Sequence, residues 1–235
     1  MDEYRKKLSE RLEKVWEPPN FSKIFLSSKN RPLQTLRKGT ILFNEGDPLG
    51  RLYYIKDGYV KIYRLSEEGR ETTSYLLGPG HVLGVRTLLT QEERTMHTAE
   101  ALTPLKVITI SRKECFENIV EHPEVLVDLI HVFGARLGYT EKKYESFVYA
   151  STSARVAIFL ADCASRFGTN KDGEIKIDLD LTHQRIAEFV GAFRETVTIA
   201  LHRLEEEGIV KVNRGNVKIL NQKKLNEYAT LGRKR

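Results

Sequence analysis

Two adjacent residues of opposite charge, Arg194 and Glu195, stand in the short run RETVT near the end of the chain. Arginine can donate two hydrogen bonds to the O6 and N7 atoms of guanine, and glutamate can accept one from the N4 amino group of cytosine. At the start of one helix, the two side chains could therefore read neighbouring bases. Such pairs also occur on solvated helix faces, so the elements around the pair must decide between the two interpretations.

The flanking sequence predicts two short helices joined by a tight turn. Thr182 is a good N-cap for a helix over 183–190, which Gly191 would end. A second helix is expected over 194–207, with Gly208 just past its end. Its apolar face would consist of Val197, Ala200, Leu201 and Leu204. This arrangement is a helix-turn-helix, whose second helix enters the DNA major groove. The alternative is an ordinary helical hairpin.

The run IVKVNRGNVKI alternates through a glycine turn and predicts a β-hairpin wing, with Lys211, Arg214 and Lys218 available for phosphates. Residues 151–235 hold 15 Lys and Arg against 11 Asp and Glu, which is +4 of the formal charge of +6. This basic bias suits a polyanionic partner such as double-stranded DNA. The predicted DNA-binding residues are Thr182, His183, Arg194, Glu195, Thr196, Thr198, Lys211 and Arg214.

A long helix from Glu124 to about Tyr149 carries apolar residues at spacings of four and three, with one polar interruption. The members of this seam are Leu126, Ile130, Phe133, Leu137, Thr140, Tyr144 and Phe147. An a/d seam of this length predicts a partner helix and hence a symmetric homodimer. The alternative is a core helix that packs on its own barrel.

Residues 36–110 read as short apolar-alternating strands separated by glycines, which predicts an antiparallel barrel or sandwich. Gly58 and Gly69 mark its clearest hairpin turns. The pattern becomes helical from Arg112. After a hinge at 149–153 we expect a helix from Arg155 to about Phe167, a polar loop GTNKDGE and a short strand IKIDLDL.

The composition sets limits on the function. The charged N-terminus and the interrupted apolar runs predict a cytoplasmic protein without a signal peptide or membrane span. Cys115 and Cys163 form no C-x-x-C pair, and the six histidines show no zinc-site spacing, so we expect no metal and no cofactor. There is no nucleophile–base set or phosphate loop, which argues against an enzyme.

The order of strands, long helix and winged helix-turn-helix resembles the cyclic AMP receptor protein/FNR superfamily of transcription regulators. The resemblance implies an α+β fold: an N-terminal helix and a cyclic-nucleotide-binding-like antiparallel β-roll (1–123), a dimerisation helix (124–150) and a winged helix-turn-helix (151–235). FRETVT looks like the family's recognition-helix start, which implies a GTG/CAC-type palindrome. Ile199 stands where the family usually has a further arginine, and Phe193 replaces its serine.

The family resemblance also bears on the effector. Cyclic-nucleotide members follow a glycine with a glutamate that accepts from the ribose hydroxyl, whereas here Val85 follows Gly84, so cyclic AMP is disfavoured. FNR-type oxygen sensing lacks its cysteines, and His81 lies off the position that haem-based sensors use. The cassette VLGVRTLLT is similar to the NtcA-type nitrogen-control branch, which implies a small anionic metabolite, 2-oxoglutarate.

The effector residues implied by this resemblance are Leu83, Gly84, Val85, Arg86 and Arg94, with Arg136 and Glu141 from the dimer helix of the partner subunit. Arg136 and Glu141 fall at g and e positions beside the seam, where an interhelical salt bridge is the alternative. An activator would touch RNA polymerase through the loop SRFGTNKDGE. Two further alternatives stay open: a regulator with another effector or none, and a regulatory subunit whose winged helix binds protein.

Overall fold

The structure is a computed structural model that describes residues 19–26, 31–89, 94–171 and 173–231. A helix, α2 (Pro19–Leu26), lies before the first strand, and residues 1–18 lie outside the described residues. The chain divides into two compact units: residues 1–64 with 74–139, and residues 65–73 with 140–235. This division falls inside the long helix rather than at 123/124, so the three-part domain boundaries stay a prediction.

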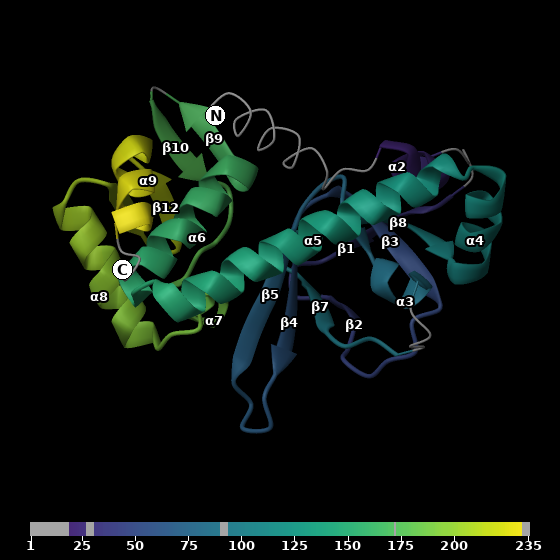
Figure 1. Cartoon of the computed structure of the whole chain (residues 1–235), viewed down its shortest axis with the longest axis horizontal. Helices are drawn as coiled ribbons and strands as arrows, with labels where there is room; N and C mark the ends of the chain where they lie inside the picture. Colours follow the sequence, from purple (N-terminus) through teal and green to yellow (C-terminus); the bar gives the residue numbers. More distant parts are fainter. Residues whose placement is uncertain (1–18, 27–30, 90–93, 172, 232–235) are drawn as a thin grey trace. The chain divides into compact units, whose positions relative to one another are not determined.

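The first unit is built on two four-stranded sheets, in the orders β1-β8-β3-β6 and β2-β7-β4-β5 (Figure 1). The strands are β1 (Leu33–Leu36), β2 (Ile41–Phe43), β3 (Arg51–Asp57), β4 (Val60–Leu65), β5 (Glu71–Leu77), β6 (Val82–Leu83), β7 (Thr98–Ala101) and β8 (Leu105–Ser111). β8 pairs antiparallel with both β1 and β3, and β7 pairs antiparallel with both β2 and β4. The expected α+β class with an antiparallel β-roll is therefore confirmed.

Two apolar clusters hold this unit together. One fills the space between the sheets and includes Ile55, Val60, Leu83, Leu105 and Val107. The other joins β3 and β8 to three helices: α2 (Pro19–Leu26), α4 (Arg112–Glu121) and the long α5 (Glu124–Tyr149). It includes Phe25, Leu52, Ile110, Cys115 and Leu129. The roll and the first half of α5 therefore share one core.

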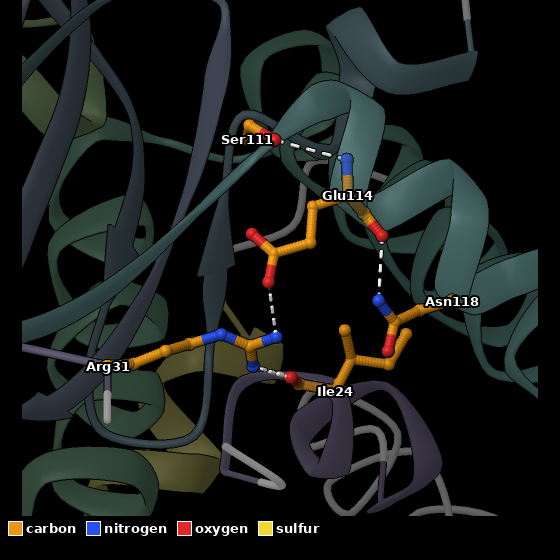
Figure 2. Close-up of polar contacts among 5 residues, drawn as sticks. All are labelled: Ile24, Arg31, Ser111, Glu114 and Asn118. Carbon is orange, nitrogen blue, oxygen red and sulfur yellow. Dashed lines mark hydrogen bonds and ion pairs between the residues drawn. The ribbon is translucent and has the colours of Figure 1, made fainter. Parts of the chain in front are cut away.

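A polar network around Arg31 fixes the helices at the edge of the roll (Figure 2). The guanidinium of Arg31 donates to the backbone carbonyl of Ile24, in α2, and lies 2.6 Å from the carboxylate of Glu114, in α4. Ser111 caps α4 by accepting from the Glu114 backbone N–H at 3.1 Å, and Asn118 donates to the Glu114 carbonyl at 2.7 Å. Because α4 leads directly into α5, this network also helps to set where α5 starts.

The long helix α5 has two different faces. Its first half buries Val125, Leu129 and Val132 against its own roll. The predicted seam lies mostly outside this buried face: Leu126 is 42% exposed, Ile130 69%, Leu137 61% and Tyr144 69%. Two seam residues differ. Phe133 is half-buried and packs against the core of the roll, and the Phe147 ring lies beside Arg155 and Gly191 of its own chain. One face of α5 is therefore that of a core helix packed on its own roll. Another face leaves most of the predicted dimer seam exposed, so each interpretation describes one face of the helix.

The second unit contains a four-stranded sheet in the order β11-β12-β10-β9. Its elements are α6 (Thr152–Phe167), β9 (Gly168–Lys171), β10 (Glu174–Ile177), α7 (His183–Val190), α8 (Arg194–Glu206), β11 (Val210–Asn213), β12 (Asn216–Ile219) and α9 (Gln222–Leu231). The helix expected from Arg155 begins three residues earlier, because Ser151 accepts from the Ala154 backbone N–H and caps it. The expected loop GTNKDGE is wrong in part: residues 168–171 form a strand that pairs with β10.

Lys143 places a buried positive charge near the end of α5. Its ammonium donates to the Thr73 carbonyl at 2.6 Å and lies 3.9 Å from the centroid of the Phe189 ring in α7. Burial lowers the pKa of Lys143 to about 8, and the opposing effect of Asp162 is weaker. The Phe147 ring lies further away, with its centroid 5.9 Å from the ammonium. The cation is therefore held by one carbonyl and two aromatic rings in a place that disfavours charge.

Each unit holds one buried cysteine. Burial raises the pKa of Cys115, in α4, to about 12, and raises the pKa of Cys163, in α6, well above its usual value. Both thiols are free, and both side chains are fully covered. They pack as small apolar residues, as the sequence predicts.

The β3–β4 turn gives a stability prediction. Gly58 has φ +89°, and a Cβ there would lie 2.3 Å from the Pro104 carbonyl oxygen. Gly39 has φ +83° but open space around it. Gly39→Ala should cost about 1–2 kcal/mol, from left-handed strain alone. Gly58→Ala should cost about 3 kcal/mol or more, since the carbonyl must also move. Denaturant unfolding measures both, and equal costs would contradict this close approach.

Lys143 gives a pH prediction. Its pKa is about 8 in the folded state against 10.5 when unperturbed, so the unfolded state binds more protons between these values. The free energy of unfolding should gain up to about 3 kcal/mol from this group as pH rises from 8 to 10.5. Lys143→Met should remove that rise and stabilise the protein at pH 7. The exposed neighbour variant Lys142→Met is the control and should keep the rise; parallel pH profiles for the two variants would overturn the assignment.

Candidate nucleic-acid interface and effector site

The helix-turn-helix has the boundaries that the sequence predicts. Thr182 caps α7 by accepting from the Arg185 backbone N–H at 3.2 Å. Gly191 ends α7 in the left-handed region at φ +62°, and Gly208 at φ +66° follows the end of α8. Phe193 is the N-cap of α8 and makes no side-chain cap hydrogen bond, as expected from the loss of a serine there.

One face of α8 is buried, and the candidate base-reading residues are exposed in its first turn. Val197, Ala200, Leu201 and Leu204 are each at most 1% exposed. Arg194, Glu195 and Thr196 are exposed in the first turn. Ile199 is 70% exposed on the same helix. The arginine and glutamate are therefore presented at the start of the helix, where a recognition helix meets base edges.

A hydrogen-bond chain ties the start of α7 to the first turn of α8. The Thr198 hydroxyl donates to the Arg194 carbonyl at 2.9 Å, and its oxygen lies 2.8 Å from Nδ1 of His183. Because the hydroxyl proton is already used, Nδ1 of His183 must carry the hydrogen of the second bond. These two bonds hold the backbone of Arg194 at the start of α8. Thr198 and His183 therefore help to position Arg194, in addition to any contact of their own with DNA.

The predicted wing is the hairpin of β11 and β12, in register from Val210 opposite Ile219 to Asn213 opposite Asn216. Arg214 is exposed in the two-residue turn, and Lys211 is exposed on β11. Lys218 lies 3.1 Å from the carboxylate of Glu174 in an ion pair, so part of its charge is already neutralised. Lys211 and Arg214 are therefore the more available cations of this wing.

Asp180 and Arg185 are two residues of this region that the sequence analysis does not single out. The guanidinium of Arg185 donates to both the carboxylate and the carbonyl of Asp180, at 2.8 and 2.6 Å. Asp180 in turn lies against Gly215 of the wing turn. The spacing of five residues between an acid and a base was the available signal, but it is common on any surface.

The predicted effector cassette lies at β6 and the short helix α3 (Val85–Leu89). Gly84 takes φ +83°, and its carbonyl accepts from the Thr87 hydroxyl at 2.8 Å. Leu83 and Val85 are buried, at 2% and 0% exposure, in the two apolar clusters. Their side chains therefore belong to the core, which leaves the backbone and the half-buried Arg86 side chain as the groups of this cassette that could bind a ligand.

Arg136 brings a buried guanidinium from α5 to this cassette. It donates to the Val82 carbonyl at 2.9 Å, and burial lowers its pKa. The pKa of His97 is also lowered, first by burial and then by nearby positive charge. The cations responsible are Arg64, Arg86 and Arg136, while Glu45 acts in the opposite sense. Arg64 is paired with Glu45 at 2.6 Å, so Arg86 and Arg136 are the cations near His97 that are suited to attract an anion.

Arg94 and Glu141 complete the predicted effector set. The guanidinium of Arg94 donates to the Gly46 carbonyl at 2.7 Å, and its backbone pairs with Pro48, so Arg94 helps to close the loop after β2. Glu141 is exposed on α5, as an e position beside a seam should be. No group of three or more metal-ligating side chains occurs among the described residues. Within the same residues, no helix has the length and apolar character needed to cross a bilayer.

Comparison with known proteins identifies two family models along the chain. Residues 33–122 match the cyclic nucleotide-binding domain, and residues 154–228 match the Crp-like helix-turn-helix domain. The first match spans strands β1 to β8, together with Gly84 and His97. The second begins within α6 and ends within α9, so it contains the whole helix-turn-helix and wing.

The chain is similar to several characterised proteins over most of their length. It is 32% identical over 188 residues to a CRP-like cAMP-activated global transcriptional regulator of Mycobacterium tuberculosis, covering 80% of this chain and 84% of that one. It is 32% identical over 199 residues to the global nitrogen regulator of Synechococcus elongatus, covering 83% and 90%. A crystal structure of a transcriptional regulator of the CRP/FNR family from Thermus thermophilus superposes with a TM-score of 0.71 at 26% identity, covering 85% and 98%.

Proposed function

Because the chain belongs to the CRP/FNR family of DNA-binding transcription regulators, and not to a family of enzymes, we propose that it is a homodimer that binds a GTG/CAC-type palindrome under the control of a small anionic metabolite. The observation that carries the proposal is the presentation of Arg194 and Glu195. Both are exposed in the first turn of a helix that is anchored to its domain by a buried apolar face. Guanine and cytosine are the bases that these side chains would read.

The exposed seam of α5 supports the homodimer. Leu126, Ile130, Leu137 and Tyr144 leave apolar surface exposed along one stripe of the helix. A second copy of the same helix would cover that stripe in a left-handed coiled coil. Two-fold symmetry would then place the two recognition helices about 34 Å apart, one turn of DNA, which a palindrome requires.

The positive potential around His97 and Arg136 supports an anionic effector. Arginines bind carboxylates through paired hydrogen bonds, and a dicarboxylate such as 2-oxoglutarate offers two such groups. The similarity to a global nitrogen regulator favours the same assignment. The similarity to a cAMP-activated regulator favours cyclic AMP instead, but Val85 is buried and apolar where the nucleotide would need a hydrogen-bond acceptor.

Under this proposal, the ligand shifts the population of two dimer arrangements only by binding one better than the other. Arg136 is suited to such a role because it joins α5 to the cassette of the roll. If the protein activates transcription, RNA polymerase would contact the β9–β10 hairpin, an exposed element of the DNA-binding unit.

The base-reading assignment predicts the effect of one substitution. Arg194→Ala should weaken binding of the dimer to a GTG/CAC palindrome by about thirtyfold or more, because one bidentate contact of about 1–3 kcal/mol is lost in each of the two half-sites. Binding to unrelated DNA should change little. Arg203→Ala removes the same charge from the last turn of α8 and serves as the control. Fluorescence anisotropy measures the affinity of the parent protein and of both variants for the palindrome and for unrelated DNA. An unchanged preference of Arg194→Ala for the palindrome would rule out base reading by this residue.

The effector assignment is tested by calorimetry with 2-oxoglutarate, cyclic AMP and cyclic GMP. Only 2-oxoglutarate should give heat, and binding should take up protons near neutral pH, because an anion raises the lowered pKa of His97. Titration in two buffers of different ionisation enthalpy measures this uptake. Arg136→Gln should abolish binding, whereas the exposed control Arg37→Gln should keep it.

Two results would contradict this assignment. Heat with a cyclic nucleotide, and none with 2-oxoglutarate, would assign the site to a nucleotide. Unchanged 2-oxoglutarate binding in Arg136→Gln would remove this arginine from the site. A melting curve of Arg136→Gln distinguishes loss of binding from loss of the fold.

A further inference from the structure

Arg214 has an unusual backbone conformation at the tip of the wing. Its φ is +44°, and it is the one residue other than glycine with a positive φ in the part of the chain that the structure describes. Arg214 and Gly215 form the two-residue turn between β11 and β12, where Asn213 pairs with Asn216. Such turns require positive φ at both central residues, and Asn or Gly adopts it at lower cost than Arg. An arginine at this position therefore makes the turn less stable than asparagine or glycine would.

The turn is held against the start of the helix-turn-helix. The Leu181 backbone N–H donates to the Gly215 carbonyl at 2.7 Å. A Cβ at Gly215 would lie 2.3 Å from Oδ1 of Asp180, so the turn backbone passes directly beside this carboxylate. Arg185, in the first turn of α7, fixes Asp180 through the two bonds described above. The wing tip therefore has a defined position relative to α7.

The same set of contacts extends to the recognition helix, α8. Thr182 and His183 begin α7, and His183 is hydrogen-bonded to Thr198 of α8. Arg214 and Arg194 are thus linked through short hydrogen bonds within one domain. When α8 lies in the major groove, the first helix crosses the phosphate backbone. The minor groove lies on the other side of that backbone, and the wing tip is held against the start of this first helix.

We propose that Arg214 inserts into the minor groove that flanks each half-site and makes the protein prefer A·T-rich flanks. This inference rests on the DNA binding described above. A narrow A·T minor groove has an enhanced negative potential that attracts arginine. Guanidinium enters it more readily than ammonium because it is more weakly hydrated. The exposed Lys211, by contrast, sits on a strand of the wing and is placed for phosphates.

The test uses the full-length protein and duplexes with one GTG/CAC palindrome and three kinds of flank, each about four base pairs long. The flanks are A·T, G·C and I·C pairs. Inosine keeps the purine O6 and N7 of the major groove but removes the N2 amino group from the minor groove. The A·T flank should bind about tenfold more tightly than the G·C flank, and I·C should restore most of that affinity.

Three variants separate the minor-groove role from simpler ones. Arg214→Lys should keep the salt dependence of binding but lose most of the flank preference. Arg214→Gly should lose the flank preference while melting no lower than the parent, because glycine relieves the turn. Lys211→Ala is the matched control and should weaken binding to all three duplexes equally.

The outcomes are distinct from those for the half-site. A duplex with a scrambled centre tests the half-site itself. If the palindrome is preferred over this duplex but flank composition has no effect, the inference is overturned and Arg214 contacts phosphate only. The same conclusion follows if Arg214→Lys keeps the flank preference. If the scrambled centre binds as well as the palindrome, the base-reading proposal fails instead. Loss of flank preference in both Arg214 variants, with the centre preference intact, supports the inference.

Discussion

The rotation of α8 about its own axis is the constraint on which the DNA-binding surface depends. Val197, Ala200, Leu201 and Leu204 form one buried stripe, and each residue turns the helix by about 100°. Once that stripe is buried, the direction of every other side chain on the helix is fixed. Glu195 then has to face outward, on the side opposite the stripe. Arg194 lies three residues before Val197, and it is exposed because it stands at the start of the helix, before the first buried residue. The hydrogen bonds among His183, Thr198 and the Arg194 carbonyl refine this orientation but do not create it.

The second constraint concerns buried positive charge, which the β-roll holds at Arg136. Arg136 is buried with its pKa lowered, and one of its donors is used on the Val82 carbonyl. Buried cations are costly unless they meet an acceptor or an anion. The same helix, α5, supplies Lys143 further along, where a carbonyl and two aromatic rings partly offset the cost. Because α5 carries two buried cations, its stability depends on the acceptors, aromatic rings and anions that lie beside them.

Periodicity and cap chemistry predicted the local structure well. Thr182, Gly191 and Gly208 marked the ends of α7 and α8 because each is a local signal that tertiary contacts did not override. The strand at 168–171 was missed, because its polar residues become a strand only by pairing with β10. The sequence could not indicate that Arg94 bonds to Gly46, which lies 48 positions away. The Asp180–Gly215 approach was equally non-local.

The two cysteines give the protein a built-in chemical readout. A thiol reacts as its thiolate, and burial keeps Cys115 and Cys163 protonated and covered. One lies in the roll and the other in the DNA-binding unit. Alkylation of the native protein must therefore wait for local opening of the unit that holds each thiol. Mass spectrometry of the two labelled peptides would follow the separate opening rates of the two units in one sample, without any engineered probe.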